Sequence, residues 1–406
     1  MLKETKDLGI YVHVPFCANK CLYCDFYTGG SRIADWSLYT KCLINELVDR
    51  EKEFVSDPTT LYFGGGTPSL IPIDELRFLI LEIKKIIDFD KLKEFTIEVN
   101  PEDVSEQAAQ VWHDLGVNRI SMGVQSFIDE ELRTIGRHHD SIMAVEAFEK
   151  IKKHFDNISL DIMFGLPGQT VSTYKQTLNI LAKLGPSHIS SYSLMLEQGT
   201  AMTFLVNNND LTLPSEEEWL EMYELSNDFF KEQGYIRYEI SNYSKAGFES
   251  VHNTNYWLGK PYIGLGPGAH SYDGGKIRRA NPNDIKGWLK FFSEYKTPVY
   301  HNQLWRENSI FGSTSLNEKR HLSEFYREEH LTEEELREEF IMTRLRMTKG
   351  LNINKYKQEF GEKEGNLFLN KAKKFINGNL LYKKGNYIAF TPSGFFLSDD
   401  ILSSLI

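Results

Sequence analysis

Short apolar runs alternate with amphipathic stretches along the first half of the chain, and this alternation limits the folds open to it. The runs are rich in β-branched and aromatic residues and cover residues 9–14, 60–66, 94–100, 119–126, 157–165 and 188–195. The stretches between them, such as 74–87, 129–136 and 141–154, carry apolar residues at helical spacing. Strand followed by helix, six times over, predicts parallel strands joined by right-handed crossovers. We therefore expect an α/β fold, either a doubly wound sheet or a partial barrel.

Glycines and polar residues gather where these predicted strands end. The second run ends in a GGGTP turn at 64–68, Glu98 and Gln125 lie near the ends of the third and fourth, Asp161 lies in the fifth, and Arg137 follows the fourth. Ligands of such folds collect at the carboxyl ends of strands. One polar residue in an apolar strand is as often a structural hydrogen-bonding partner as a ligand contact. Their recurrence at successive strands favours a binding site.

Three of the four cysteines fall within eight residues, as Cys17, Cys21 and Cys24. A zinc site would require a second pair of ligands, which does not follow, and a thioredoxin-type C-x-x-C pair would leave Cys17 unexplained. Three thiolates on one short loop suit a [4Fe–4S] cluster with one iron open to a further ligand. The fourth, Cys42, lies beside Leu43 and Leu47 on a predicted helix, where we expect it to pack in the core.

The chain of 406 residues is acidic, with a net charge of −11 and a pI of about 5.6. Its lysines at 349–357 and 371–374 alternate with acids, so we expect no nucleic-acid binding. No run approaches the roughly 18 apolar residues of a membrane-spanning helix. The first residues lack the apolar core of a signal peptide. We expect a cytoplasmic protein, in which thiols stay reduced.

The pattern of predicted elements changes after a break near 211–215. In order, it predicts a helix at 216–235, an edge strand at 238–243, a glycine-rich aromatic segment at 252–272 and a helix at 288–294. Thr332, followed by acids, is typical of a helix start. Two more helices and a hairpin about Lys384-Gly385 are predicted after it. We expect three units, at residues 1–212, 213–325 and 326–406.

Motifs spread over most of the chain resemble one superfamily. They are YVHVPFCANKCLYCDF, LYFGGGTPS, IEVNPE, RISMGVQSF, GRHHD, DIMFGLPGQT and HNTNYWLGKPYIGLGPGAHSY. The set is similar to the radical S-adenosylmethionine (SAM) superfamily, and within it to the coproporphyrinogen oxidase-like group. This resemblance implies a partial (β/α)6 TIM-type barrel with a carboxyl-terminal α+β, winged-helix-like module. It also implies a [4Fe–4S] cluster whose open iron is chelated by SAM.

Two branches of that group compete. The oxygen-independent coproporphyrinogen III oxidases carry a further cysteine two residues after the third, and a longer amino-terminal arm. Here Phe26 holds that position, and sixteen residues precede Cys17. Together with the HNxxYW motif at 252–257, these departures resemble the haem chaperones of the group. The expected function is to bind haem and transfer it to acceptor haemoproteins, among which membrane respiratory proteins are candidates. The alternatives are the oxidase and another radical SAM enzyme, so catalysis stays open.

The resemblance also implies roles for single residues. Tyr11, Gly65 and Glu98 match contacts to SAM, and Tyr23 would pack against its adenine. The positions that match contacts to a second SAM in the oxidase are Gly66, Thr67, Gln125, Arg137 and Asp161. Because a neutral imidazole is a normal haem ligand, His252 is the candidate axial ligand. Its alternative role is to cap a turn. The acceptor and the oligomeric state are not indicated, and a peripheral position at the membrane stays open.

Overall fold

The computed structural model describes residues 7–30, 34–294 and 325–406 of the chain. Its main feature is a twelve-stranded sheet in the order β14-β13-β12-β11-β1-β4-β5-β6-β7-β8-β10-β9. The six predicted strands form adjacent parallel neighbours and are confirmed. They are β1 (Leu8–Val14), β4 (Pro58–Gly65), β5 (Glu94–Val99), β6 (Arg119–Gln125), β7 (Ile158–Phe164) and β8 (His188–Ser193). The end strands β14 and β9 do not pair in the described residues, so the sheet is an open barrel.

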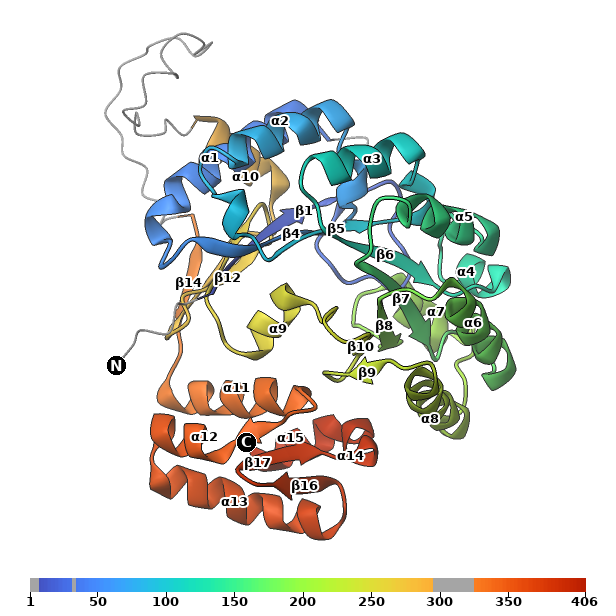
Figure 1. Ribbon diagram of the computed structural model, residues 1–406, viewed down its shortest axis with the longest axis vertical. Coiled ribbons are helices and arrows are strands. Elements are labelled where there is room, and N and C mark those ends of the chain that lie inside the picture. Colours follow the sequence, from blue (N-terminus) through green and yellow to red (C-terminus); the bar gives the residue numbers. More distant parts are fainter. Residues whose placement is uncertain (1–6, 31–33, 295–324) are drawn as a thin grey trace.

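Helices cover the outer, convex side of this sheet (Figure 1). They are α1 (Trp36–Arg50), α2 (Ile73–Ile83), α3 (Glu106–Asp114), α4 (Asp129–Thr134), α5 (Ser141–Ile151), α6 (Val171–Leu184) and α8 (Glu216–Glu232). Each buries one apolar face against the strands, as α2 does with Leu76, Leu79 and Ile80. Polar side chains cap several amino termini, for example Asp35 at α1. The expected α/β fold is confirmed.

Shorter strands extend the sheet at both edges. A seventh parallel strand, β11 (Tyr262–Leu265), pairs with β1. Antiparallel strands follow it, namely β12 (His270–Tyr272), β13 (Ile277–Ala280) and β14 (Arg327–His330). The other edge carries β10 (Asn242–Ser244) and β9 (Ile236–Arg237). The single edge strand predicted at 238–243 is thus only partly correct, because residues 238–241 connect two short strands. Two further helices, α7 (Ala201–Asn207) and α10 (Ile285–Glu294), pack beside the sheet.

A short helix, α9 (Val251–Trp257), lies on the concave side of the sheet (Figure 1). It contains the HNxxYW motif, for which the sequence predicted no helix. The Ser250 side chain accepts a hydrogen bond from the Asn253 amide and so begins the helix. The buried Glu94 carboxylate on β5 also accepts from the Ser250 hydroxyl and from the amides of Val251 and His252. A negative charge at a helix amino terminus stabilises it.

The carboxyl-terminal module combines helices with a small sheet and lies next to α9 (Figure 1). Its strands are β15 (Leu351–Asn352), β16 (Leu381–Lys384) and β17 (Tyr387–Phe390), and its helices are α11 (Glu333–Arg346), α12 (Ile353–Phe360), α13 (Glu362–Asn377), α14 (Pro392–Phe396) and α15 (Ser398–Leu405). The predicted capping of α11 by Thr332 and the hairpin are confirmed. The last two helices were not predicted.

The boundaries between the three expected units stay predictions. The strand β14 belongs to the main sheet, and the helices of the last module begin at Glu333. Within the described residues, no helix combines the length and the apolar character that crossing a membrane requires.

Candidate functional site

The three clustered cysteines lie on the loop between β1 and α1, at the carboxyl end of β1. All three thiols are free and partly exposed. Two short strands, β2 (Phe16–Cys17) and β3 (Gly29–Gly30), pair at the two ends of this loop. The loop is also anchored in its middle, because the Leu22 amide donates to Ile135 O at 3.2 Å and Leu22 O accepts from the Met202 amide at 2.8 Å. The loop is therefore held from several sides.

Two side chains from other loops donate to the sulfurs of this loop. Thr67 Oγ1 donates to Cys17 Sγ at 3.5 Å, and Arg137 Nη1 donates to Cys21 Sγ at 3.6 Å. Burial raises the pKa of the Cys17 and Cys24 thiols. Donors and positive charge beside a sulfur favour its thiolate form.

The donor set agrees with the chemistry of a [4Fe–4S] cluster. Three free thiols come from one loop, and the exposed Phe26 stands where a further cysteine would lie. Across the described ranges, no three His, Cys, Asp or Glu side chains are arranged to hold a single metal ion. Cluster irons are held by separate thiolates, one to each iron, so three thiols spread along a loop fit a cluster with one open iron.

The glycine turn at the end of β4 lies directly against the cysteine loop. Gly66 N donates to Val14 O at 2.7 Å, and Thr67 N donates to Phe16 O at 2.8 Å. Gly65 has a φ of 111°, and a Cβ there would come within 2.6 Å of His13 Nδ1. A Cβ on Gly66 would come within 2.7 Å of Phe16 O. At this turn the backbone therefore comes close to the protein's own β1 and cysteine loop.

The three residues expected to contact the first SAM form one group. Glu98 Oε2 accepts from the Gly65 amide at 3.2 Å, and its Oε1 accepts from the Tyr62 hydroxyl at 2.7 Å. The Tyr11 ring lies 6.1 Å from that of Tyr62, centroid to centroid. Burial raises the pKa of Glu98 to about 7, an effect that its two hydrogen bonds only partly offset. The Glu98 carboxyl group is therefore near its titration midpoint at neutral pH.

Arg137 crosses from the loop after α4 toward β5, β6 and the cysteines. Its Nη2 donates to Asn100 Oδ1 at 2.8 Å and to Gly123 O at 2.6 Å. Gly123 begins a bulge in β6, after which Gln125 adopts a φ of 66°, unusual for a residue with a side chain. Of the expected second-SAM residues, Gly66, Thr67 and Arg137 gather at the cysteine loop.

Asp161 lies apart from Arg137, among the polar residues inside the barrel. Its carboxylate accepts from Ser121 at 3.0 Å and from Ser159 at 2.9 Å. Burial raises its pKa. The negative charge of Asp161 adds to the rise in the pKa of Glu98, so the two carboxyl groups lie in one interior region.

His252 is placed differently from every other predicted site residue. It lies on α9 with 1% of its surface exposed, against the amino-terminal half of β4. Its Nδ1 is hydrogen-bonded to Thr60 Oγ1 at 2.7 Å and its Nε2 to the Tyr256 hydroxyl at 2.7 Å. Burial lowers its pKa to about 3, so the imidazole is neutral. Both nitrogens are engaged, and in this conformation neither is free to bind iron.

Sequence reasoning did not assign roles to Asn100 and Tyr62, although both contact expected site residues. Asn100 directly follows the strand that carries Glu98. An amide side chain at a strand end was the sequence signal that could have identified it as a site residue. The Tyr62 hydroxyl could be assigned only once the register of β4 against β5 was known. Tyr23 packs with Leu22 against the small apolar cluster of Ile135, Met163, Leu166 and Met202.

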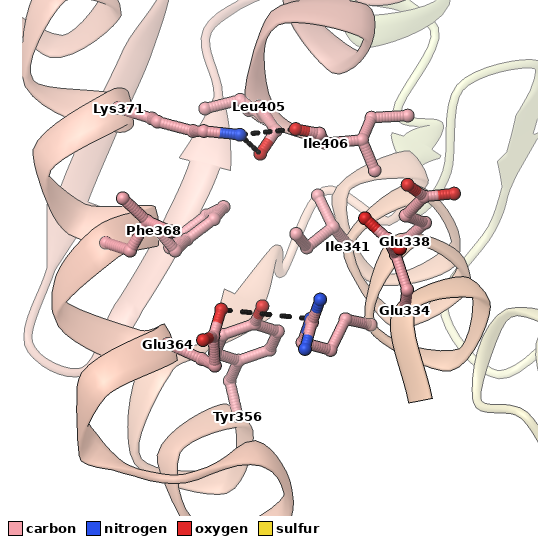
Figure 2. Close-up of a pocket in the computed structure, with 11 residues that line it drawn as sticks. Glu334, Glu338, Ile341, Tyr356, Glu364, Phe368, Lys371, Leu405 and Ile406 are labelled. Carbon is pink, nitrogen blue, oxygen red and sulfur yellow. Dashed lines mark hydrogen bonds and ion pairs between the residues drawn. The ribbon is translucent and has the colours of Figure 1, made fainter. Parts of the chain in front are cut away.

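A cavity of about 150 Å³ lies in the carboxyl-terminal module, between α11, α13 and the end of α15 (Figure 2). Ile341 and Phe368 form its apolar part, and Lys371 closes one end by donating to the carbonyls of Leu405 and Ile406. Ligand pockets usually hold 300 Å³ or more, so this cavity is small for an organic cofactor.

Comparison with known proteins places this geometry in context. Residues 11–181 match the Radical SAM superfamily, and residues 331–397 match the HemN C-terminal domain. The proteins named heme chaperone HemW from Bacillus subtilis and Lactococcus lactis are 32% and 34% identical to this chain. The alignments cover 98% and 99% of this chain and 98% of each relative. A mitochondrial radical SAM domain-containing protein 1 from Danio rerio is 35% identical, over 75% of this chain and 72% of its own.

Among solved structures, coproporphyrinogen III oxidase (HemN) from Escherichia coli superimposes with a TM-score of 0.78 at 20% identity. The alignment covers 98% of this chain and 90% of that one. At that identity the likeness shows the fold, and it confirms the expected partial barrel with its carboxyl-terminal module. The full-length matches at more than 30% identity show the family. The chain belongs to the HemW family of the radical SAM superfamily.

Proposed function

We propose that the chain is a haem chaperone, which binds haem and transfers it to acceptor haemoproteins. The observation that carries the proposal is the match, along almost the whole chain, to two relatives named heme chaperone. Phe26 in place of a further cysteine supports it against the oxidase reading. The oxidase from E. coli supports the fold alone.

Cys17, Cys21 and Cys24 would hold a [4Fe–4S] cluster, and SAM would bind beside them. The reduced cluster supplies the electron for reductive cleavage of SAM when both are bound. Glu98 would face the positively charged part of SAM. Because a nearby positive charge lowers the pKa of a carboxyl, binding would ionise Glu98, which stands near its titration midpoint at neutral pH.

Haem binding through His252 would require α9 to move. Iron needs the lone pair of one imidazole nitrogen, and both are hydrogen-bonded. The helix is held at its amino end by Glu94 and at its carboxyl end by Arg344 of α11, which donates to the carbonyls of Trp257 and Leu258. We therefore propose that the haem-bound conformation has α9 displaced from β4, and that His252 has a structural role in the conformation described.

The proposed setting is the cytoplasm, with haem as the small-molecule partner. The acceptor haemoproteins are not identified, and membrane-bound acceptors would place the protein at the membrane periphery while haem is transferred. No nucleic-acid partner is proposed, because the net charge is −11.

The test is one anaerobic assay of reconstituted protein with reductant and SAM, run with coproporphyrinogen III and in parallel with haem. The proposal expects a stable haem complex that loads an apo-haemoprotein, and no decarboxylated porphyrinogen. Formation of protoporphyrinogen would replace the proposal by the oxidase. Failure both to bind haem and to decarboxylate the porphyrinogen would point to another radical SAM enzyme.

A further inference from the structure

A continuous series of hydrogen bonds joins two of the clustered cysteines through side chains of three other segments. Thr67 Oγ1 donates to Cys17 Sγ at 3.5 Å and accepts from Asn100 Nδ2 at 3.4 Å. Asn100 Oδ1 accepts from Arg137 Nη2 at 2.8 Å, and Arg137 Nη1 donates to Cys21 Sγ at 3.6 Å. Asn100 is the central member, since its amide is hydrogen-bonded to both Thr67 and Arg137.

In this structure the side chains of Arg137 and Thr67 donate hydrogen bonds to cysteine sulfurs. The family resemblance implies that both contact a second SAM. In this structure the two terminal nitrogens of Arg137 are occupied by Cys21, Asn100 and Gly123 O. Its Nε is buried without a hydrogen-bond partner among the described residues. Negative charge stabilises a partly buried guanidinium; Glu102 supplies some of it in this structure, and a thiolate at Cys21 would add to it.

Donors aimed at a cluster sulfur alter how easily the cluster is reduced. Reduction adds an electron that is shared with the sulfurs. A hydrogen bond or positive charge beside them stabilises the reduced form and raises the reduction potential. Thr67 contributes a hydroxyl, and Arg137 contributes a hydrogen bond together with a full charge.

We propose that Asn100 is a positioning residue that locks Thr67 against Cys17 and Arg137 against Cys21, and so raises the reduction potential of the cluster held there. The inference rests on the proposed cluster. It assigns a role to Asn100 and adds control of the cluster to the roles expected of Thr67 and Arg137.

The test is an anaerobic redox titration of reconstituted protein without SAM, so that no second SAM contributes. The variants are Asn100→Leu, Thr67→Val, Arg137→Lys and Arg137→Met. The control is Arg133→Met, which removes an exposed arginine from α4 near Arg137 in sequence. Iron and sulfide content are measured in each sample.

We expect full cluster content with a more negative midpoint potential in Asn100→Leu and Thr67→Val. The shift should be largest in Arg137→Met, smaller in Arg137→Lys, which keeps the charge, and absent in Arg133→Met. A wild-type potential in both Asn100→Leu and Thr67→Val at full content would overturn the inference. Loss of the cluster from all four variants would also overturn it, in favour of a purely structural role. A wild-type protein that holds no cluster would instead refute the proposed function.

Discussion

The ring of Tyr62 stacks on the imidazole of His252, with centroids 4.9 Å apart and an interplanar angle of 26°. The hydroxyl of the same tyrosine donates to Glu98. One side chain of β4 therefore connects the residue expected to bind haem with the carboxylate expected to face SAM. Any displacement of α9 removes a ring from one face of Tyr62 and changes the environment of Glu98.

Single substitutions should distinguish the three clustered cysteines from Cys42. Replacing Cys17, Cys21 or Cys24 with Ala should abolish the iron–sulfur absorbance after anaerobic reconstitution, because each thiolate holds one iron. Cys42→Ala should retain it, since that thiol is buried in α1 and donates to Leu289 O. Its expected cost is about 1 kcal/mol in the free energy of unfolding. Retention of the cluster without Cys24 would contradict the assignment.

Gly65→Ala should destabilise the protein more than an equivalent change in open space. Both Gly65 and Gly168 have positive φ, at 111° and 75°, but only at Gly65 would the new Cβ meet His13. Positive φ alone costs about 1–2 kcal/mol for a residue with Cβ. We expect Gly168→Ala to cost that amount and Gly65→Ala clearly more, with weaker SAM binding. Urea unfolding and SAM titration measure the two effects, and equal costs would show that the His13 contact yields easily.

The raised pKa of Glu98 predicts a pH dependence of stability in the ligand-free protein. The pKa is about 7 in the folded chain against 4.5 for the unfolded group. Between these values the folded state binds the extra proton, so this contribution is present at low pH and is lost as pH rises through about 7. At about 1.4 kcal/mol per pKa unit, the loss is at most about 3.5 kcal/mol.

Glu98→Gln should remove that contribution, because its side chain does not titrate. We expect the stability of wild type relative to Glu98→Gln to fall as the pH is raised from about 5 to about 8. Urea unfolding of both proteins at the two pH values measures this difference. A difference that does not vary with pH would mean that Glu98 titrates normally.

Loosening α9 should favour haem binding if His252 is the ligand. Arg344→Met removes the donors to the carbonyls of Trp257 and Leu258. The free energy needed to displace α9 should fall by about 1–3 kcal/mol. Since 1.4 kcal/mol is tenfold in affinity, haem should bind about tenfold more tightly. The matched control is Arg337→Met on the same helix, where the ion pair with Glu364 stays within the module.

Soret-band titrations of wild type, Arg344→Met, Arg337→Met and His252→Leu measure this effect. We expect His252→Leu to shift the band and weaken binding, in agreement with loss of an axial ligand. An unchanged affinity in Arg344→Met would show that α9 need not move. An unchanged band in His252→Leu would remove that residue from the haem site.

Much of the fold could be predicted because its signals are local. Short apolar runs placed the six central strands, and helical spacing placed the helices predicted at 74–87, 129–136 and 141–154, to within a few residues. The helix α9 was not predicted, because its stability comes from Glu94, more than 150 residues earlier in the chain. The two last helices follow the predicted hairpin and are short, with little room for a periodic signal.

The candidate site was also predicted only in part: the sequence identified residues, and the structure showed their contacts. Strand ends identified Glu98, Gln125 and Asp161 as site candidates, and the C-x3-C-x2-C spacing identified the cluster loop. Which of them touch was decided by strand register and by the β6 bulge. Gly65 illustrates the difference, because its need to lack a side chain was visible in the sequence, whereas the group it approaches, His13, was not.

By itself, the sequence determined the six central strands with helices between them, the parallel α/β architecture and the thiol donor set, because these depend on residue type and spacing over short distances. Only the tertiary structure decided that Asn100 lies between Thr67 and Arg137, and that both nitrogens of His252 are engaged. Apart from the bond between His252 and Tyr256 on the same helix, those contacts join residues tens to hundreds of positions apart, and packing and register bring them together. No local pattern records such pairings, since each partner is compatible with many others until the chain is folded.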